Sequence, residues 1–194
     1  MQTTRMEAFS DGVLAVIITI MVLELKVPGG ASLADLLALA PVLLAYLLSF
    51  IYIGIYWNNH HHMLHSVRRI GGASLWANLH LLFWLSFVPL VTAWAGAHPR
   101  APTPTAVYGV VLLMSALAWV LLQTSLIATE CEDSLLATAV GRDRKGKVSL
   151  VIYLAAIALA FVDPALAQLA YALVALIWLV PDRRIERVLA AAGD

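Results

Sequence analysis

Two groups of residues have side chains that could ionise, carry a proton or hold a metal inside otherwise apolar stretches. The first is a set of carboxylates near the ends of the first apolar run: Glu7, Asp11 and Glu24. The second is a histidine cluster at the end of the next apolar run: His60, His61, His62 and His65. A carboxylate in an apolar run is costly unless it faces protein or water, so Asp11 predicts a polar contact between helices.

The histidine cluster raises the possibility of a metal site, because His61 and His65 are four residues apart and can share a helix face. No cysteine lies near them in the sequence, and no acidic residue stands out as a third ligand. We therefore favour a hydrogen-bonding role for the cluster and predict no metal site and no cofactor. A membrane enzyme built on these histidines is the weaker alternative, because the sequence offers no persuasive nucleophile, carboxylate pair or metal triad.

Composition indicates the setting of these residues. The chain has 194 residues, of which 62% are hydrophobic and 12% are charged. This is far too apolar for an ordinary soluble domain and predicts an integral membrane protein. The formal net charge of zero gives no reason to expect a nucleic-acid partner, and the single cysteine, Cys131, excludes an intrachain disulfide.

The apolar stretches predict an all-α bundle of six transmembrane helices in a single domain, 1–194, since about 20 apolar residues span a bilayer. The expected helices cover residues 6–25, 36–60, 73–97, 106–128, 148–162 and 165–180. The last two come from one long apolar region divided by Asp163-Pro164, a dipeptide that favours a turn. Both are short, so a re-entrant pair is the alternative to two full crossings.

Six crossings place both termini on one side of the membrane, and the basic residues then favour an orientation. Ten of the 12 Lys and Arg residues fall on that side: Arg5, Arg68, Arg69, Arg142, Arg144, Lys145, Lys147, Arg183, Arg184 and Arg187. Lys26 and Arg100 lie opposite. By the positive-inside rule, we predict a multi-pass protein of the cell inner (plasma) membrane with both termini cytoplasmic.

The first predicted helix has an apolar stripe. Successive residues are rotated by about 100°, which aligns Phe9, Val13, Val16, Ile20, Leu23 and Val27. Ser10 and Asp11 are offset from this stripe, so we expect Asp11 to face neighbouring helices of its own subunit. Its candidate partners are Trp57, Asn58, Asn59, His60, His61, Trp76 and Asn78.

Three motifs carry a resemblance to a known family. The first helix opens with Arg5-x-x-x-Phe9-Ser10-Asp11, the second ends with Trp57-x-x-His60-His61, and the third contains Asn78 followed by Pro89 and Thr92. In this order the motifs resemble the transmembrane protein 175 family, the lysosomal potassium channels and their prokaryotic relatives. The resemblance covers the whole chain as one six-helix unit. It implies a homotetramer whose first helices line the pore.

The resemblance also implies roles for individual residues. The pore constriction would be formed by Val16, Ile20 and Leu23, with Thr19 nearby as a hydroxyl ligand. A polar clamp would orient the first helix through Arg5, Phe9, Ser10, Asp11, Trp57, His60, His61 and Asn78. Pattern alone favours lipid or core contact for the apolar stripe. Glu24 could attract cations to the pore mouth, although pairing with Lys26 or a place among the headgroups is favoured.

We therefore expect a potassium-permeable cation channel with no enzymatic activity, whose partners are copies of itself, membrane lipid and monovalent cations. A ring of apolar side chains can close a pore by dewetting, and the sequence has no TVGYG-like filter segment. A secondary transporter of a cation or small solute is the alternative. The absence of formal charges from the middle of the spans disfavours a transporter. Pro89 favours one, because it would break the third helix, and transporters commonly bind their substrates at broken helices.

Overall fold

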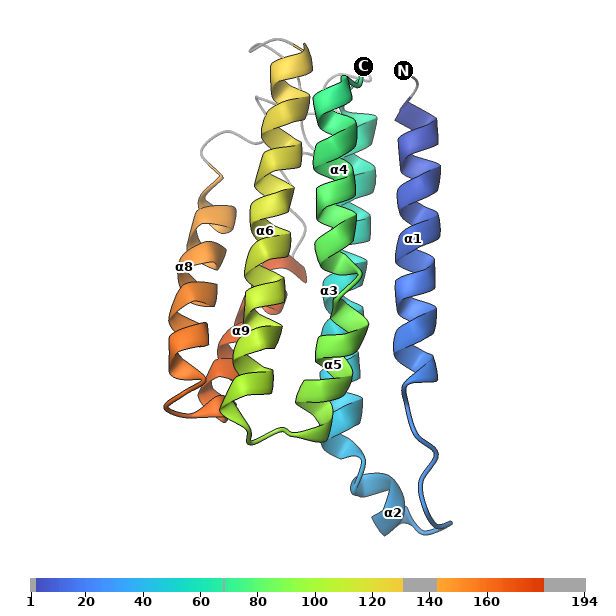
Figure 1. Ribbon diagram of the computed structural model, residues 1–194, viewed down its shortest axis with the longest axis vertical. Helices are drawn as coiled ribbons and strands as arrows, with labels where there is room; N and C mark the ends of the chain where they lie inside the picture. The colour runs from blue at the N-terminus through green and yellow to red at the C-terminus, as the bar shows by residue number, and fades with distance from the viewer. Residues whose placement is uncertain (1–2, 68, 131–142, 180–194) are drawn as a thin grey trace.

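A computed structural model of the chain describes residues 3–67, 69–130 and 143–179. All regular secondary structure in these ranges is helical, and all of these helices except the short α2 run side by side along the long axis of the molecule (Figure 1). Their bounds are α1 Thr3–Leu23, α2 Leu33–Leu37, α3 Ala40–His65, α4 Gly72–Leu85, α5 Val88–Ala97, α6 Pro102–Glu130, α8 Arg144–Leu159 and α9 Pro164–Leu179. Cys131 and five of the basic residues used for the orientation, Arg68, Arg142, Arg183, Arg184 and Arg187, lie outside the described residues.

Four segments among the described residues are long and apolar enough to cross a membrane. They are α1, α3, α4 together with α5, and α6 as far as Thr129. This agrees with an all-α, multi-pass membrane protein. The helices α8 and α9 have 16 residues each, or about 24 Å, which is shorter than the hydrocarbon core of about 30 Å. Six full crossings therefore remain a prediction.

The second predicted span, 36–60, differs from the structure at both ends. Its start belongs to α2, which is capped by Ser32: the Asp35 amide donates to Ser32 Oγ at 3.2 Å, and the Asp35 carboxylate accepts from the Ser32 amide at 3.0 Å. Pro41 has no N–H with which to continue that helix, so α3 starts afresh at Ala40. At the other end α3 continues to His65, which places the histidine cluster on its last turns.

The third predicted span, 73–97, is a helix with a break. α4 ends at Leu85 and α5 begins at Val88, with Pro89 in its first turn. Because Pro89 cannot donate to the Leu85 carbonyl, the regular hydrogen-bond ladder is interrupted there. Asn78 and Thr92 consequently lie on two separate helices.

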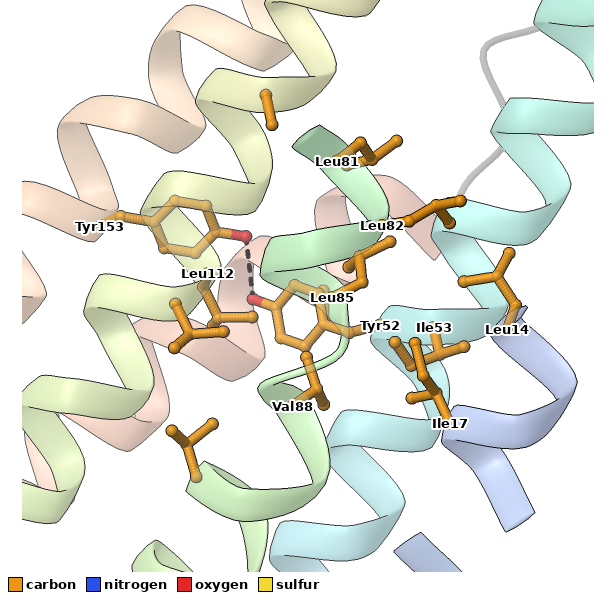
Figure 2. Close-up of a cluster of buried hydrophobic side chains, with 14 of the residues drawn as sticks. Leu14, Ile17, Tyr52, Ile53, Leu81, Leu82, Leu85, Val88, Leu112 and Tyr153 are labelled. Atoms are coloured by element: carbon orange, nitrogen blue, oxygen red, sulfur yellow. Dashed lines mark hydrogen bonds between the residues drawn. The ribbon is translucent and has the colours of Figure 1, made fainter. Parts of the chain in front are cut away.

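Tyrosines connect α3 to the two C-terminal helices. Tyr52 OH donates to the Tyr171 carbonyl oxygen at 2.6 Å. Tyr153 OH donates to Tyr52 OH at 3.2 Å, as Figure 2 shows. Opposite them on α6, Gly109 leaves room for Tyr171: a Cβ on Gly109 would lie 2.0 Å from Tyr171 OH. Asp163 Oδ1 accepts from the Ala165 amide at 2.8 Å in the turn between α8 and α9.

Candidate functional site

One face of α1 is covered by its own chain. Met6, Leu14, Ile17 and Met21 are buried on this face, and α1 packs against α3, α4 and α5. Figure 2 shows Leu14 and Ile17 pointing toward Ile53 of α3 and Leu82 of α4. These contacts fix how α1 is rotated in the bundle, and so decide which residues are left uncovered.

The uncovered face of α1 carries most of the predicted stripe, whereas Val13 of that stripe is half-buried against the core. Val16 is 57% exposed and Leu23 is 77% exposed, and Phe9 and Ile20 are exposed with them. Thr19 is also exposed, and its hydroxyl donates to the Ala15 carbonyl at 2.8 Å. Because that proton is committed to the helix, the Thr19 hydroxyl oxygen can take part in further contacts only as an acceptor.

A buried polar chain holds α1 to α4 and α3. Ser10 Oγ donates to the Met6 carbonyl at 2.8 Å, so it can only accept from Asn78 Nδ2, which lies 2.9 Å away. Asn78 Oδ1 then faces His60 Nε2 at 2.8 Å, and His60 must be the donor. All three side chains are buried, so each hydrogen bond replaces one to water.

The polar chain leaves one atom without a partner. His60 Nδ1 is buried and has no hydrogen-bond partner among the described residues. A single proton on His60, carried by Nε2, is therefore sufficient for the hydrogen bonds of this polar chain. Ser10, His60 and Asn78, three residues of the predicted clamp, are thus brought together on three helices.

Other residues of the predicted clamp lie elsewhere. Asp11 is half-buried, and within the described ranges its carboxylate has no hydrogen bond or ion pair, although it was expected to bond neighbouring helices. Ser10 makes that contact instead, because it lies about 100° away on the helix and faces Asn78 directly. Arg5 and Phe9 are exposed, and neither contacts Asn78 or His60 through a hydrogen bond or ring.

A second polar group joins α1 to the end of α3. Glu7 Oε1 lies 2.9 Å from His61 Nδ1 and 3.7 Å from His65 Nδ1. Trp57, which is exposed, stacks against the His61 ring with centroids 6.4 Å apart. The sequence predicts only that Glu7 lies at the end of the first helix. The one sequence signal for a contact between Glu7 and a neighbouring helix is its spacing of four from Asp11, which puts Glu7 one helical turn earlier on a similar face.

Glu24 follows the last residue of α1. Its backbone amide donates to the Ile20 carbonyl at 3.1 Å, and its side chain is exposed. No ion pair between Glu24 and Lys26 is present in the described part of the chain. The sequence favoured either this pairing or a place among the headgroups for Glu24, and of these two the place among the headgroups stays a prediction.

Comparison with known proteins identifies the family. Residues 5–89, which include nearly all of α1 and the polar chain, match the family of the endosomal/lysosomal potassium channel TMEM175. The fold is similar to the crystal structure of a lysosomal potassium-selective channel TMEM175 homolog from Chamaesiphon minutus. That match has a TM-score of 0.82 and 32% identity, and covers 93% of this chain and 97% of the other. The chain belongs to the TMEM175 family.

Curated relatives of this TMEM175 chain are channels. A potassium channel of Chryseobacterium sp. (strain P1-3) is 54% identical over 185 residues, which are 95% of this chain and 96% of the relative. The human endosomal/lysosomal proton channel TMEM175 is 34% identical over 110 residues, which are 50% of this chain but 22% of the human protein. The resemblance seen in the three sequence motifs is confirmed, and the family is one of ion channels rather than enzymes.

Proposed function

We propose that this protein is a potassium-permeable cation channel, in which four copies of the chain surround one pore and each contributes the uncovered face of α1. The observation that carries the proposal is the asymmetry of α1. Its Leu14 and Ile17 face is buried by its own subunit, whereas the face with Val16, Ile20 and Leu23 is open. The names of the relatives supply the expectation of potassium.

The residues on the open face suit a hydrophobic gate. Rings of Val16, Ile20 and Leu23 present no hydrogen-bonding groups, so a narrow pore lined by them would lose its water and block ions. Conduction then requires these rings to widen. Thr19 lies between two of the rings in sequence, and its exposed hydroxyl oxygen would offer the permeant ion an oxygen contact to replace part of its hydration.

The buried polar chain connects the helix that carries the proposed gate, α1, to α4 and α3. Ser10 lies about two and a half turns before Thr19 on the same helix and is hydrogen-bonded through Asn78 to His60. We infer that this connection sets the rotation of α1, and with it which side chains face the pore. In this role Ser10, Asn78 and His60 position the pore helix and do not contact the ion. We further propose that the channel lies in the cell inner membrane with both termini cytoplasmic.

The proposal is tested by measuring ion flux into liposomes that contain the purified protein, under potassium and then sodium gradients. Wild-type protein should pass potassium faster than sodium. Val16→Ala should change the rate or the selectivity, because it removes two methyl groups per subunit from the proposed ring of Val16 side chains. Val22→Ala is the matched control, because Val22 is 47% exposed but lies about 120° from Val16 around α1. A folded tetramer that passes no cation would refute the channel.

Proton permeation is the second candidate, because the human relative is named a proton channel. The same liposomes loaded with a pH-sensitive dye measure proton flux directly. Proton flux that persists without potassium and exceeds potassium flux would favour this candidate over the first.

A further inference from the structure

Three potential metal ligands from two helices meet at the end of the bundle where α1 begins and α3 ends. Glu7 comes from α1, and His61 and His65 come from the last two turns of α3. One ligand atom from each residue can be chosen so that all three lie within 4.8 Å of one another. The sequence provided the histidine pair but no acidic third ligand, and the packing of α1 against α3 supplies it.

The spacing of these atoms is close to that of a metal site. Two ligands bound at about 2.0 Å in a tetrahedral arrangement lie about 3.3 Å apart. The measured distances from Glu7 Oε1 are 2.9 Å to His61 Nδ1 and 3.7 Å to His65 Nδ1. A simple hydrogen bond between Glu7 and His61 does not require His65 to approach the same oxygen.

The two imidazole rings also have access to solution. Their centroids are 4.1 Å apart, and the side chains of His61 and His65 are 44% and 54% exposed. Glu7 is less exposed, at 20%, so the carboxylate forms the inner side of the group. An ion arriving from solution would keep water at a fourth position, as metals with three protein ligands do.

The ligand types select the class of metal. Two imidazole nitrogens and one carboxylate oxygen suit zinc, copper, nickel and cobalt, whereas magnesium and calcium prefer oxygen ligands throughout. One carboxylate also offsets part of the charge of a divalent ion. His65 Nδ1 lies 3.1 Å from the His61 carbonyl, and binding would replace this hydrogen bond with a metal bond.

We propose that Glu7, His61 and His65 form a binding site for a divalent transition metal, with zinc as the representative ion. The site joins the first turns of α1 to the last turns of α3, so an occupied site holds these two helix ends together. It lies outside the ion path proposed above, and its test does not depend on channel activity.

The experiment is calorimetric titration of zinc chloride into the full-length protein in detergent. The protein is purified without a polyhistidine tag and first freed of metal by EDTA. Wild type should bind one zinc ion per chain, and magnesium chloride should give no binding. His65→Ala and Glu7→Gln should each weaken zinc binding by at least about tenfold, since even outer partners of metal ligands commonly have effects of this size.

The matched control is His98→Ala. His98 is exposed at the other end of the bundle, and its Nδ1 also lies against the carbonyl four residues earlier, at 3.3 Å. This variant should bind zinc as wild type does. Glu7→Gln retains a side chain that can bond His61, so it provides a second folded variant if His65→Ala fails to fold. Absence of zinc binding by wild type would overturn the proposal, and so would equal binding by wild type and the folded ligand variants.

Discussion

Asn78→Ala tests the buried polar chain that connects α1 to α4 and α3. The substitution removes two hydrogen bonds, from Asn78 to Ser10 and from His60 to Asn78, of 2.9 and 2.8 Å. It also leaves the His60 Nε2 proton without an acceptor in a side chain that is 2% exposed.

The expected cost follows from these two losses. Side-chain hydrogen bonds between membrane helices average about 0.6 kcal/mol and reach about 1.7 kcal/mol. An orphaned buried donor costs about 1–3 kcal/mol in proteins generally. We therefore expect Asn78→Ala to lower the free energy of unfolding by about 1–3 kcal/mol.

The assay is denaturation of the purified protein in mixed micelles, followed by helical circular dichroism. Asn59→Ala is the matched control, because Asn59 Nδ2 donates at 2.8 Å to the Ile55 carbonyl of its own helix and, among the described residues, makes no hydrogen bond to another helix. The control should change the unfolding free energy by less than about 0.5 kcal/mol. A double-mutant cycle with Ser10→Ala should give a coupling of about 0.6 kcal/mol or more. Equal destabilisation by Asn78→Ala and Asn59→Ala would refute the connecting role.

Two further predictions concern packing and pH. Gly109→Ala should destabilise or misfold the protein, because the added Cβ would lie 2.0 Å from Tyr171 OH. Gly54→Ala is the control and should be tolerated in the same denaturation assay, because a Cβ on Gly54 would have no described atom within 4 Å. The hydrogen bonds from Ser32 lower the pKa of Asp35 below its ordinary value of 3.8. The ionised Asp35 carboxylate therefore stabilises α2 fully above about pH 3.8, and this stabilisation is lost as the pH falls through the lowered pKa of the folded protein. An NMR titration of the Asp35 carboxyl should show the lowered pKa in wild type and a return toward 3.8 in Ser32→Ala; an identical pKa in both would contradict the capping assignment.

Periodicity predicted the two faces of α1 but not their neighbours. The stripe through Val16 and Ile20 follows from helical geometry alone, and the structure leaves this face open. The sequence could not choose between Asn59 and Asn78 as partners of α1, since both have the right chemistry and a similar predicted depth. The choice depends on how α3 and α4 are rotated, which is set by packing far from either residue.

The Glu7 contact could not be predicted for a related reason. Glu7 and His61 are 54 residues apart, and they meet because α1 and α3 pack with opposite directions. A break within the second predicted span was more accessible: the spacing Ser32-x-x-Asp35 is a capping box, and Pro41 follows it closely. Local signals of this kind outweigh an apolar run, which by itself predicts one uninterrupted helix.

Cysteine accessibility measures whether the uncovered face of α1 lines the ion path. In a background with Cys131 replaced by serine, Val16→Cys and Val22→Cys are reconstituted separately and treated with a charged methanethiosulfonate reagent during potassium flux. We predict that the reagent blocks flux through Val16→Cys and leaves Val22→Cys unaffected. Block of Val22→Cys with no effect on Val16→Cys would contradict this prediction and would place a different face of α1 at the pore.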